Sequence, residues 1–135
     1  MVPVTHDAVG HWLTEHEGAL MRQHAHGEAL VRAGGACGSD GSVGREACGL
    51  VLQIQGRWMY APTDNVAIAA DEYMVDPERH RQLISAGVQV VGVFHSHVNA
   101  GARASELDLA MAQDGLWYVI YSVRDQEFNW WLEGG

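Results

Sequence analysis

The sequence predicts an α/β (α+β) fold, in which a mixed β-sheet is flanked by helices within a single compact domain. Segments of helical and of strand character alternate along the chain, which is typical of this class. A length of 135 residues with 47% hydrophobic content suits one hydrophobic core and leaves little room for a second. We therefore expect one domain over residues 1–135.

The N-terminal third predicts a helical region followed by a loop. Residues 5–33 are rich in Ala, Leu, Glu, Gln and Arg, which favour helices, although Gly10, Gly18 and Gly27 weaken the pattern. Residues 34–44 contain five glycines and two serines, and ordering them costs much conformational entropy. We expect this glycine-rich segment to be a flexible loop inside the domain.

The middle of the chain predicts a β-hairpin. Residues 48–54 and 57–61 read as strands, and Gln55-Gly56 between them is a tight-turn pair. The segment Pro-Thr-Asp-Asn at 62–65 has turn chemistry, so we expect the second strand to end before it.

A helix and a central strand follow the hairpin. Asp76-Pro77 combines an N-cap residue with proline at the first helical position, and Gly87 is a natural stop. These signals predict a helix over 77–86. Residues 88–95 form a nearly continuous apolar run, which is typical of a strand covered on both faces.

The C-terminal part predicts one helix and two strands. Residues 105–114 read as a helix closed by Gly115. Residues 116–123 and 128–132 read as strands, with the polar turn 124–127 between them.

Composition excludes several classes of function. Eight arginines and no lysine face seventeen acidic residues, giving a formal charge of −9, which argues against binding a nucleic-acid backbone. The longest apolar run is too short to span a membrane, and the N-terminus has no signal-peptide pattern. Cys37 and Cys48 make no disulfide framework, so we expect a reducing, cytoplasmic location.

Three residues of metal-ligand type lie in one short segment. His95 ends the predicted central strand and His97 lies two residues further on; because residues i and i+2 of a strand point to the same face, both side chains can aim at one point just past the strand. Ser105 opens the next predicted helix, and Asp108 lies on the same side of its first turn. Two imidazoles and one carboxylate with a fourth position open are the ligand count of a catalytic zinc site. We expect one zinc ion per chain.

A catalytic zinc site also needs a general base. Glu46, just before the strand at 48–54, is a candidate if that strand lies beside the strand that carries the histidines. From the residues alone, this base remains ambiguous among the seventeen acidic residues.

These segments together resemble the JAMM (JAB1/MPN) zinc metallopeptidase family. The resemblance combines Arg-Glu-Ala-Cys-Gly-Leu at 45–50 with His-Ser-His, seven residues, Ser, two residues and Asp. Residues 61–67 and 73–78 look like the connecting segment of the family, so the similarity covers residues 45 to 123. One departure is Val98, where many members have proline.

The resemblance implies a fold, a set of roles and a reaction. The fold is the MPN/JAB-like sheet flanked by helices, and the implied zinc ligands are His95, His97 and Asp108. Glu46 is implied as the general base and Ser105 as a residue that stabilises the oxyanion. The implied reaction is hydrolysis of the amide bond after the Gly-Gly tail of a ubiquitin-like protein, either free or in a conjugate.

Three functional interpretations remain open at this point. The 48 residues at 47–94 leave no room for large insertions, which suggests a minimal bacterial or phage-type member. Such a member would deconjugate or process a ubiquitin-like protein in a bacterial pathway, including antiphage defence. Alternatively, it would process a sulfur carrier or act in phage-tail assembly. Residues 115–122 are somewhat similar to the JAMM domain of phage-tail assembly proteins. The third interpretation is a non-catalytic MPN scaffold, which would typically have lost ligands. The oligomeric state is open.

Ordinary structural roles compete for several of these residues. Ser105-x-x-Asp108 is close to a helix capping box, which is common without metal. We expect Cys48 to pack as a small hydrophobic residue. Arg45 and Arg103 flank the motif and are candidates for docking an acidic partner. We expect the remaining histidines to be solvated and the indoles to pack in the core and at the sheet edge: His6, His11, His16, His24, His26 and His80; Trp117, Trp130 and Trp131.

Overall fold

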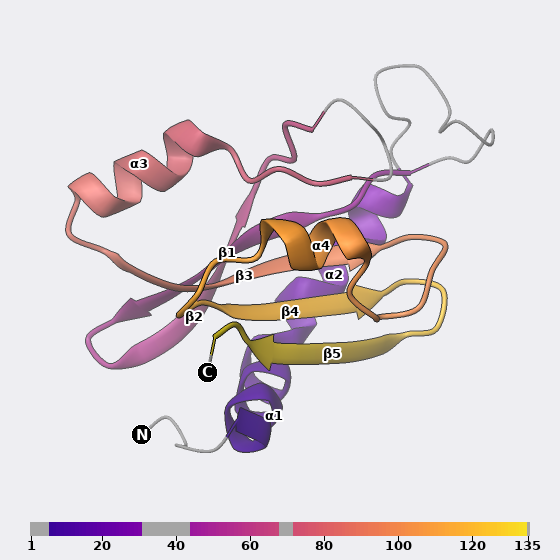
Figure 1. The fold of residues 1–135 in the computed structure, drawn as a ribbon, viewed down its shortest axis with the longest axis horizontal. Helices are drawn as coiled ribbons and strands as arrows, with labels where there is room; N and C mark the ends of the chain where they lie inside the picture. Colours follow the sequence, from indigo (N-terminus) through magenta and orange to yellow (C-terminus); the bar gives the residue numbers. More distant parts are fainter. Residues whose placement is uncertain (1–5, 31–43, 68–71, 135) are drawn as a thin grey trace.

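The computed structural model describes residues 6–30, 44–67 and 72–134, and it confirms the predicted fold class. A five-stranded mixed sheet has the strand order β2-β1-β3-β4-β5, with β3 in the middle (Figure 1). The elements in chain order are α1 (His6–His16), α2 (Gly18–Ala29), β1 (Cys48–Ile54), β2 (Arg57–Thr63), α3 (Pro77–Ser85), β3 (Gln89–His97), α4 (Glu106–Met111), β4 (Trp117–Ser122) and β5 (Glu127–Leu132).

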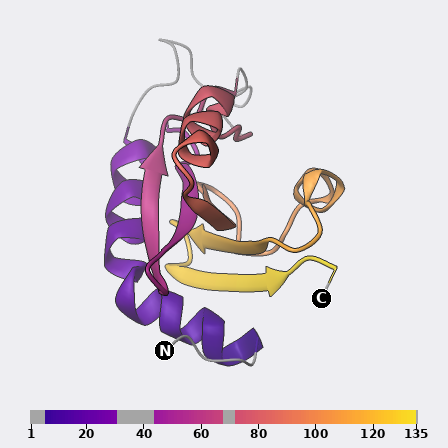
Figure 2. The same ribbon diagram turned by 90° about the vertical axis from the view of Figure 1, so that its left-hand side faces the viewer.

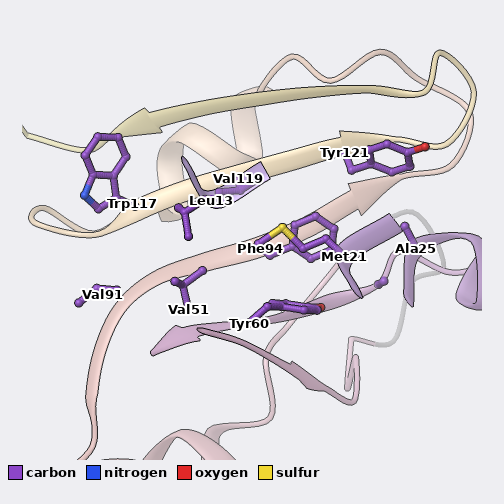
Figure 3. Close-up of a cluster of buried hydrophobic side chains, with 11 residues drawn as sticks. Leu13, Met21, Ala25, Val51, Tyr60, Val91, Phe94, Trp117, Val119 and Tyr121 are labelled. Atoms are coloured by element: carbon purple, nitrogen blue, oxygen red, sulfur yellow. The ribbon is translucent and has the colours of Figure 1, made fainter. Parts of the chain in front are cut away.

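Helices cover both faces of the sheet. Figure 2 shows α1 and α2 on one side and α3 and α4 on the other. Against α1 and α2, the core is built around Leu13, Met21 and Phe94, all fully buried (Figure 3). On the opposite face, Leu83 of α3 packs with Val93 and other apolar side chains of the sheet. Since both faces of β3 are covered, its apolar sequence follows from its position.

The pairing of β3 positions the site. β3 is antiparallel to β1, with Cys48 opposite His95, and parallel to β4, with His97 opposite Ser122. Parallel strands need a crossover connection, and here the crossover contains α4. The C-terminal end of β3 therefore lies between the start of β1 and the helix that follows β3.

Two local predictions are confirmed in detail. Gln55 and Gly56 both have positive φ (51° and 77°), as a two-residue type I′ hairpin turn requires. At the start of α3, the Asp76 carboxylate accepts the backbone N–H of Glu78, and Pro77 occupies the first turn.

Three predicted boundaries are wrong, and one of them is the end of the central strand, because β3 continues past His95 to His97. β2 continues to Thr63, because it is an edge strand and Pro62 needs no partner on its outer side. α4 ends at Met111 and not at Asp114, because the backbone N–H of Gln113 donates to the Tyr118 hydroxyl instead of continuing the helix.

The N-terminal region is helical as predicted over the described residues, and it is divided into the two helices α1 and α2. Glu17 separates α1 from α2, and its carboxylate accepts the backbone N–H of Tyr60 on the edge strand β2. Residues 31–33 and the predicted loop 34–44, except Gly44, lie outside the described residues. None of the helices in the described ranges has the length and hydropathy needed to cross a membrane.

Candidate metal centre

The candidate site begins with two histidines at the C-terminal end of β3. His95 and His97 alternate with Ser96 and point to the face of the sheet that α4 covers. His95 is fully buried and His97 is 7% exposed. Their Nε2 atoms lie 3.2 Å apart, which is the convergence that the i, i+2 spacing predicted.

The first turn of α4 brings the carboxylate of Asp108 to the same point. Asp108 is buried, and its Oδ2 atom lies 3.2 Å from Nε2 of His95 and 3.2 Å from Nε2 of His97. The three atoms therefore form a triangle with sides of 3.2 Å.

Glu46 joins this cluster from the residue pair before β1. It is 8% exposed, and ligand atoms of Glu46, His95 and His97 all lie within 4.8 Å of one another. The backbone of Ala47 anchors this segment, since its N–H donates to the Ser96 hydroxyl and its carbonyl accepts the Ser96 N–H. The strand at 48–54 lies beside the strand that carries the histidines, as the assignment of Glu46 as a candidate base requires.

A backbone contact selects the tautomer of His97. Its Nδ1 atom lies 2.8 Å from the Gly101 carbonyl oxygen, which only accepts, so Nδ1 carries the proton. When the ring is neutral, the lone pair of Nε2 then faces the cluster. Orientation of a metal-ligating histidine by a second hydrogen bond of this kind is common.

Burial and hydrogen bonding set the charges of the cluster. Complete burial lowers the pKa of His95 more than Asp108 raises it, which favours the neutral imidazole. Burial also lowers the pKa of His97, but hydrogen bonds to Asp108 and to Gly101 outweigh it, and the net pKa is raised. Burial opposes ionisation of Asp108, yet hydrogen bonds from His95 and His97 hold its pKa well below the usual range.

This donor set fits a divalent metal ion. Tetrahedral zinc with bonds of about 2.0–2.1 Å holds its ligand atoms roughly 3.3–3.4 Å apart, close to the 3.2 Å found here. An ionised carboxylate and imidazole nitrogens are also the ligand types that such an ion prefers. Independently of Asp108, the buried ligand atoms of Glu46, His95 and His97 lie close enough together to hold a metal ion.

Ser105 and Tyr73 border the cluster. Ser105 is the exposed N-cap of α4, and its hydroxyl accepts the backbone N–H of Asp108. The ring of Tyr73 stacks on His95, with a centroid distance of 4.0 Å and an interplanar angle of 13°. Tyr73 was not predicted as a site residue, because an aromatic residue in a connecting segment carries no signal of what it contacts.

Other sequence predictions have mixed outcomes. Cys48 is fully buried, and burial raises the pKa of its thiol to about 11, so packing as a small hydrophobic residue is confirmed. The predicted solvation of His24 is wrong, since its ring is half-buried with Nδ1 2.7 Å from the Tyr60 hydroxyl. His26, although exposed, also contacts a tyrosine hydroxyl, that of Tyr121. The predicted packing of the indoles is confirmed: Trp117 is buried, and Trp130 and Trp131 pack against the two core clusters.

Arg45 has a role that the sequence did not predict. Its guanidinium donates to the carbonyl oxygens of Asn65 and Ala67, both at 2.8 Å, and its side chain is half-buried. Arg45 therefore supports the loop beside the cluster, whereas Arg103 is exposed.

The chain is similar to a known protein family and to solved structures. Residues 39–133 match the family described as prokaryotic homologs of the JAB domain. Among solved structures, the solution structure of protein DSY2949 from Desulfitobacterium hafniense is 22% identical and has a TM-score of 0.59, covering 84% of this chain and 76% of that chain. A protein from Salinibacter ruber is 25% identical with a TM-score of 0.48, covering 84% and 78%. No curated protein matches the chain.

The family match covers well over half of the sequence and includes every residue of the cluster, and the similarity to DSY2949 supports the same fold. The chain therefore belongs to the prokaryotic homologues of the JAB domain.

Proposed function

We propose that this protein is a JAMM-type zinc isopeptidase or peptidase that hydrolyses the amide bond after the C-terminal Gly-Gly tail of a ubiquitin-like protein. The observation that carries this proposal is the triangle of His95, His97 and Asp108 ligand atoms, 3.2 Å apart, with the Glu46 carboxyl group beside it. Two nitrogen ligands, one oxygen ligand and an adjacent acid make up the set that metal-assisted hydrolysis needs.

Each residue has a defined part in the proposed reaction. His95, His97 and Asp108 hold one zinc ion per chain. When bound, zinc supplies Lewis acidity that lowers the pKa of water and polarises a carbonyl group. Glu46 accepts a proton as the water oxygen bonds to the carbonyl carbon. It then gives that proton to the amine nitrogen as the carbon–nitrogen bond breaks.

Ser105 is suited to stabilise the oxyanion. Its hydroxyl oxygen accepts the Asp108 N–H at 3.0 Å, so the hydroxyl proton is available to donate elsewhere. A donor held in this way costs little reorganisation when negative charge develops on the substrate oxygen.

The expected substrate is an extended tail that ends in small residues, because glycine lets a backbone approach a metal closely. The amine side is a lysine of a conjugate or the continuation of a precursor chain. The charge of −9 makes a nucleic-acid partner unfavourable. Processing of a sulfur carrier or a phage-tail protein would use the same chemistry, whereas a purely scaffolding role would not need the complete ligand set.

Cleavage of a fusion protein tests the proposal. The substrate is a ubiquitin-like protein whose Gly-Gly tail is linked to a reporter, incubated with the zinc-loaded protein. We expect a single cut after the second glycine and loss of cleavage in His95→Ala/His97→Ala, which should also lose zinc by metal analysis. His80→Ala, on α3, is the matched control and should behave as wild type. Absence of cleavage by zinc-loaded wild type across ubiquitin-like and sulfur-carrier fusions would contradict the proposal.

A further inference from the structure

Asn65 lies beside the cluster and uses the full hydrogen-bonding capacity of its side chain. Its Nδ2 atom donates to the carbonyl oxygens of Glu46 and Glu72, both at 2.9 Å. Its Oδ1 atom accepts the backbone N–H groups of Ala67 and Met74, at 2.9 and 3.0 Å. A primary amide has two N–H donors and two acceptor lone pairs, so this side chain is completely satisfied.

The partners of Asn65 lie next to the residues of the cluster. One is the carbonyl of Glu46 itself. Two others are the carbonyl of Glu72 and the N–H of Met74, which are the peptide groups on either side of Tyr73. The Tyr73 ring in turn stacks on His95. One amide thus contacts the backbone of Glu46 directly and reaches His95 through Tyr73.

His95 needs such support more than His97 does. The Nδ1 atom of His97 is oriented by the Gly101 carbonyl. By contrast, the buried Nδ1 atom of His95 has no hydrogen-bond partner among the described residues. A ring without a second polar contact depends on packing for its orientation, and the stacked face of Tyr73 is the contact that provides it.

We propose that Asn65 is a positioning residue of the metal centre, which anchors the backbone of Glu46 and holds Tyr73 against His95. The hydrogen bonds of the Asn65 side chain all go to backbone groups, so its proposed action is indirect. The inference rests on the proposed function only in assuming that His95 is a metal ligand.

Asn65→Asp is the first test. Aspartate keeps the shape and the Oδ1 contacts but replaces the Nδ2 donor by an oxygen that repels the carbonyls of Glu46 and Glu72. We expect zinc binding to weaken by about 10-fold or more, the usual scale for loss of outer-shell support. In metal-free protein, the NMR signals of the His95 ring should lose the shift caused by the Tyr73 ring.

Asn129→Asp is the matched control. It makes the same change of charge on β5, where the side-chain oxygen accepts the backbone N–H of Trp130, a contact that aspartate retains. It should bind zinc as wild type does. A folded Asn65→Asp variant with unchanged His95 signals and zinc affinity within twofold of wild type would overturn the proposal.

A second pair of variants keeps the test decisive if Asn65→Asp unfolds. Tyr73→Phe retains the stacked ring and should match wild type, whereas Tyr73→Leu removes it and should weaken zinc binding and move the His95 signals. If both single variants fold, the double variant Asn65→Asp/Tyr73→Leu should bind zinc no more weakly than the weaker-binding single variant. The reason is that both changes affect zinc binding through the same contact, the stacking of Tyr73 on His95. Wild-type behaviour of Tyr73→Leu, or fully additive losses, would overturn the proposal.

These measurements need no substrate, so their outcome is separate from that of the proposed function. A protein that binds zinc but cleaves no fusion would refute the peptidase proposal and leave the role of Asn65 to be decided by zinc affinity. The NMR comparison is made on metal-free protein and decides the Tyr73–His95 contact even if wild type binds no zinc.

Discussion

Ser105 and Asp108 cap the start of α4 reciprocally. The Ser105 hydroxyl accepts the Asp108 N–H at 3.0 Å, and Asp108 Oδ2 accepts the Ser105 N–H at 2.9 Å. The same Oδ2 atom lies 3.2 Å from Nε2 of both His95 and His97. From the sequence, the capping box and the metal-type cluster are competing interpretations of these residues. In the structure they are one arrangement, in which the capping hydrogen bonds orient the Asp108 carboxylate toward the two histidines.

Glu46→Gln separates the proposed base from the proposed ligands. The amide preserves volume but cannot accept the proton from water, so we expect hydrolysis to fall by at least ~10²-fold with the fold and zinc content retained. Steady-state kinetics and metal analysis on the same preparation check this. Glu106→Gln, at an exposed position of α4, is the control and should keep its activity. Loss of zinc in Glu46→Gln would instead make Glu46 a ligand.

His24 should make stability depend on pH. Burial lowers the pKa of His24 in the folded protein, although Glu28 and Asp64 raise it. The unfolded chain therefore takes up a proton on His24 more readily than the folded protein does. The contribution of neutral His24 to the free energy of unfolding is complete above the ordinary pKa of about 6.5 and is lost as the pH falls below it. Between pH 7.5 and 5.5, we expect the melting temperature of metal-free protein to fall less in His24→Gln than in wild type. An identical fall in both would contradict this assignment.

Gly10 and Gly27 should respond in opposite ways to alanine. A Cβ atom at Gly10 would overlap atoms of the Trp130 indole, so Gly10→Ala should destabilise the protein by about 1–3 kcal/mol. At Gly27, nothing lies within 4 Å of the added atom, and Gly27→Ala should stabilise α2 by roughly 0.5–1 kcal/mol. Urea unfolding measures both values. Gly10 lies on α1 and Trp130 on β5, so equal effects of the two substitutions would contradict close packing of α1 on β5.

Arg103 is the remaining candidate for docking the body of an acidic partner, since Arg45 is engaged by loop carbonyls. We expect Arg103→Glu to raise KM for a full-length ubiquitin-like fusion more than for a short Gly-Gly peptide, because only the fusion presents a charged body. Arg57→Glu, exposed at the hairpin turn, makes the same change of charge and should leave both KM values unchanged. Equal effects of Arg103→Glu on the two substrates would rule out docking.

Much of the fold and the cluster could be predicted because the signals are local. The turn at Gln55-Gly56 and the helix start at Asp76-Pro77 depend on the backbone preferences of adjacent residues. The convergence of His95 and His97 follows from the two-residue period of a strand, which holds in any sheet.

Contacts between distant segments were decided only by the tertiary structure. The pairing of β1 with β3 brings Glu46, one of seventeen acidic residues, beside the two histidines, and Tyr73 stacks on His95 although the two are far apart in the sequence. The early end of α4 depends on the Tyr118 hydroxyl. The need for glycine at position 10 depends on the indole of Trp130, which leaves no room for a Cβ atom. Local patterns determine which way a side chain points from its own element. Which other side chain it contacts depends on the packing of segments that are distant in the sequence. The sequence of one segment alone does not specify that contact.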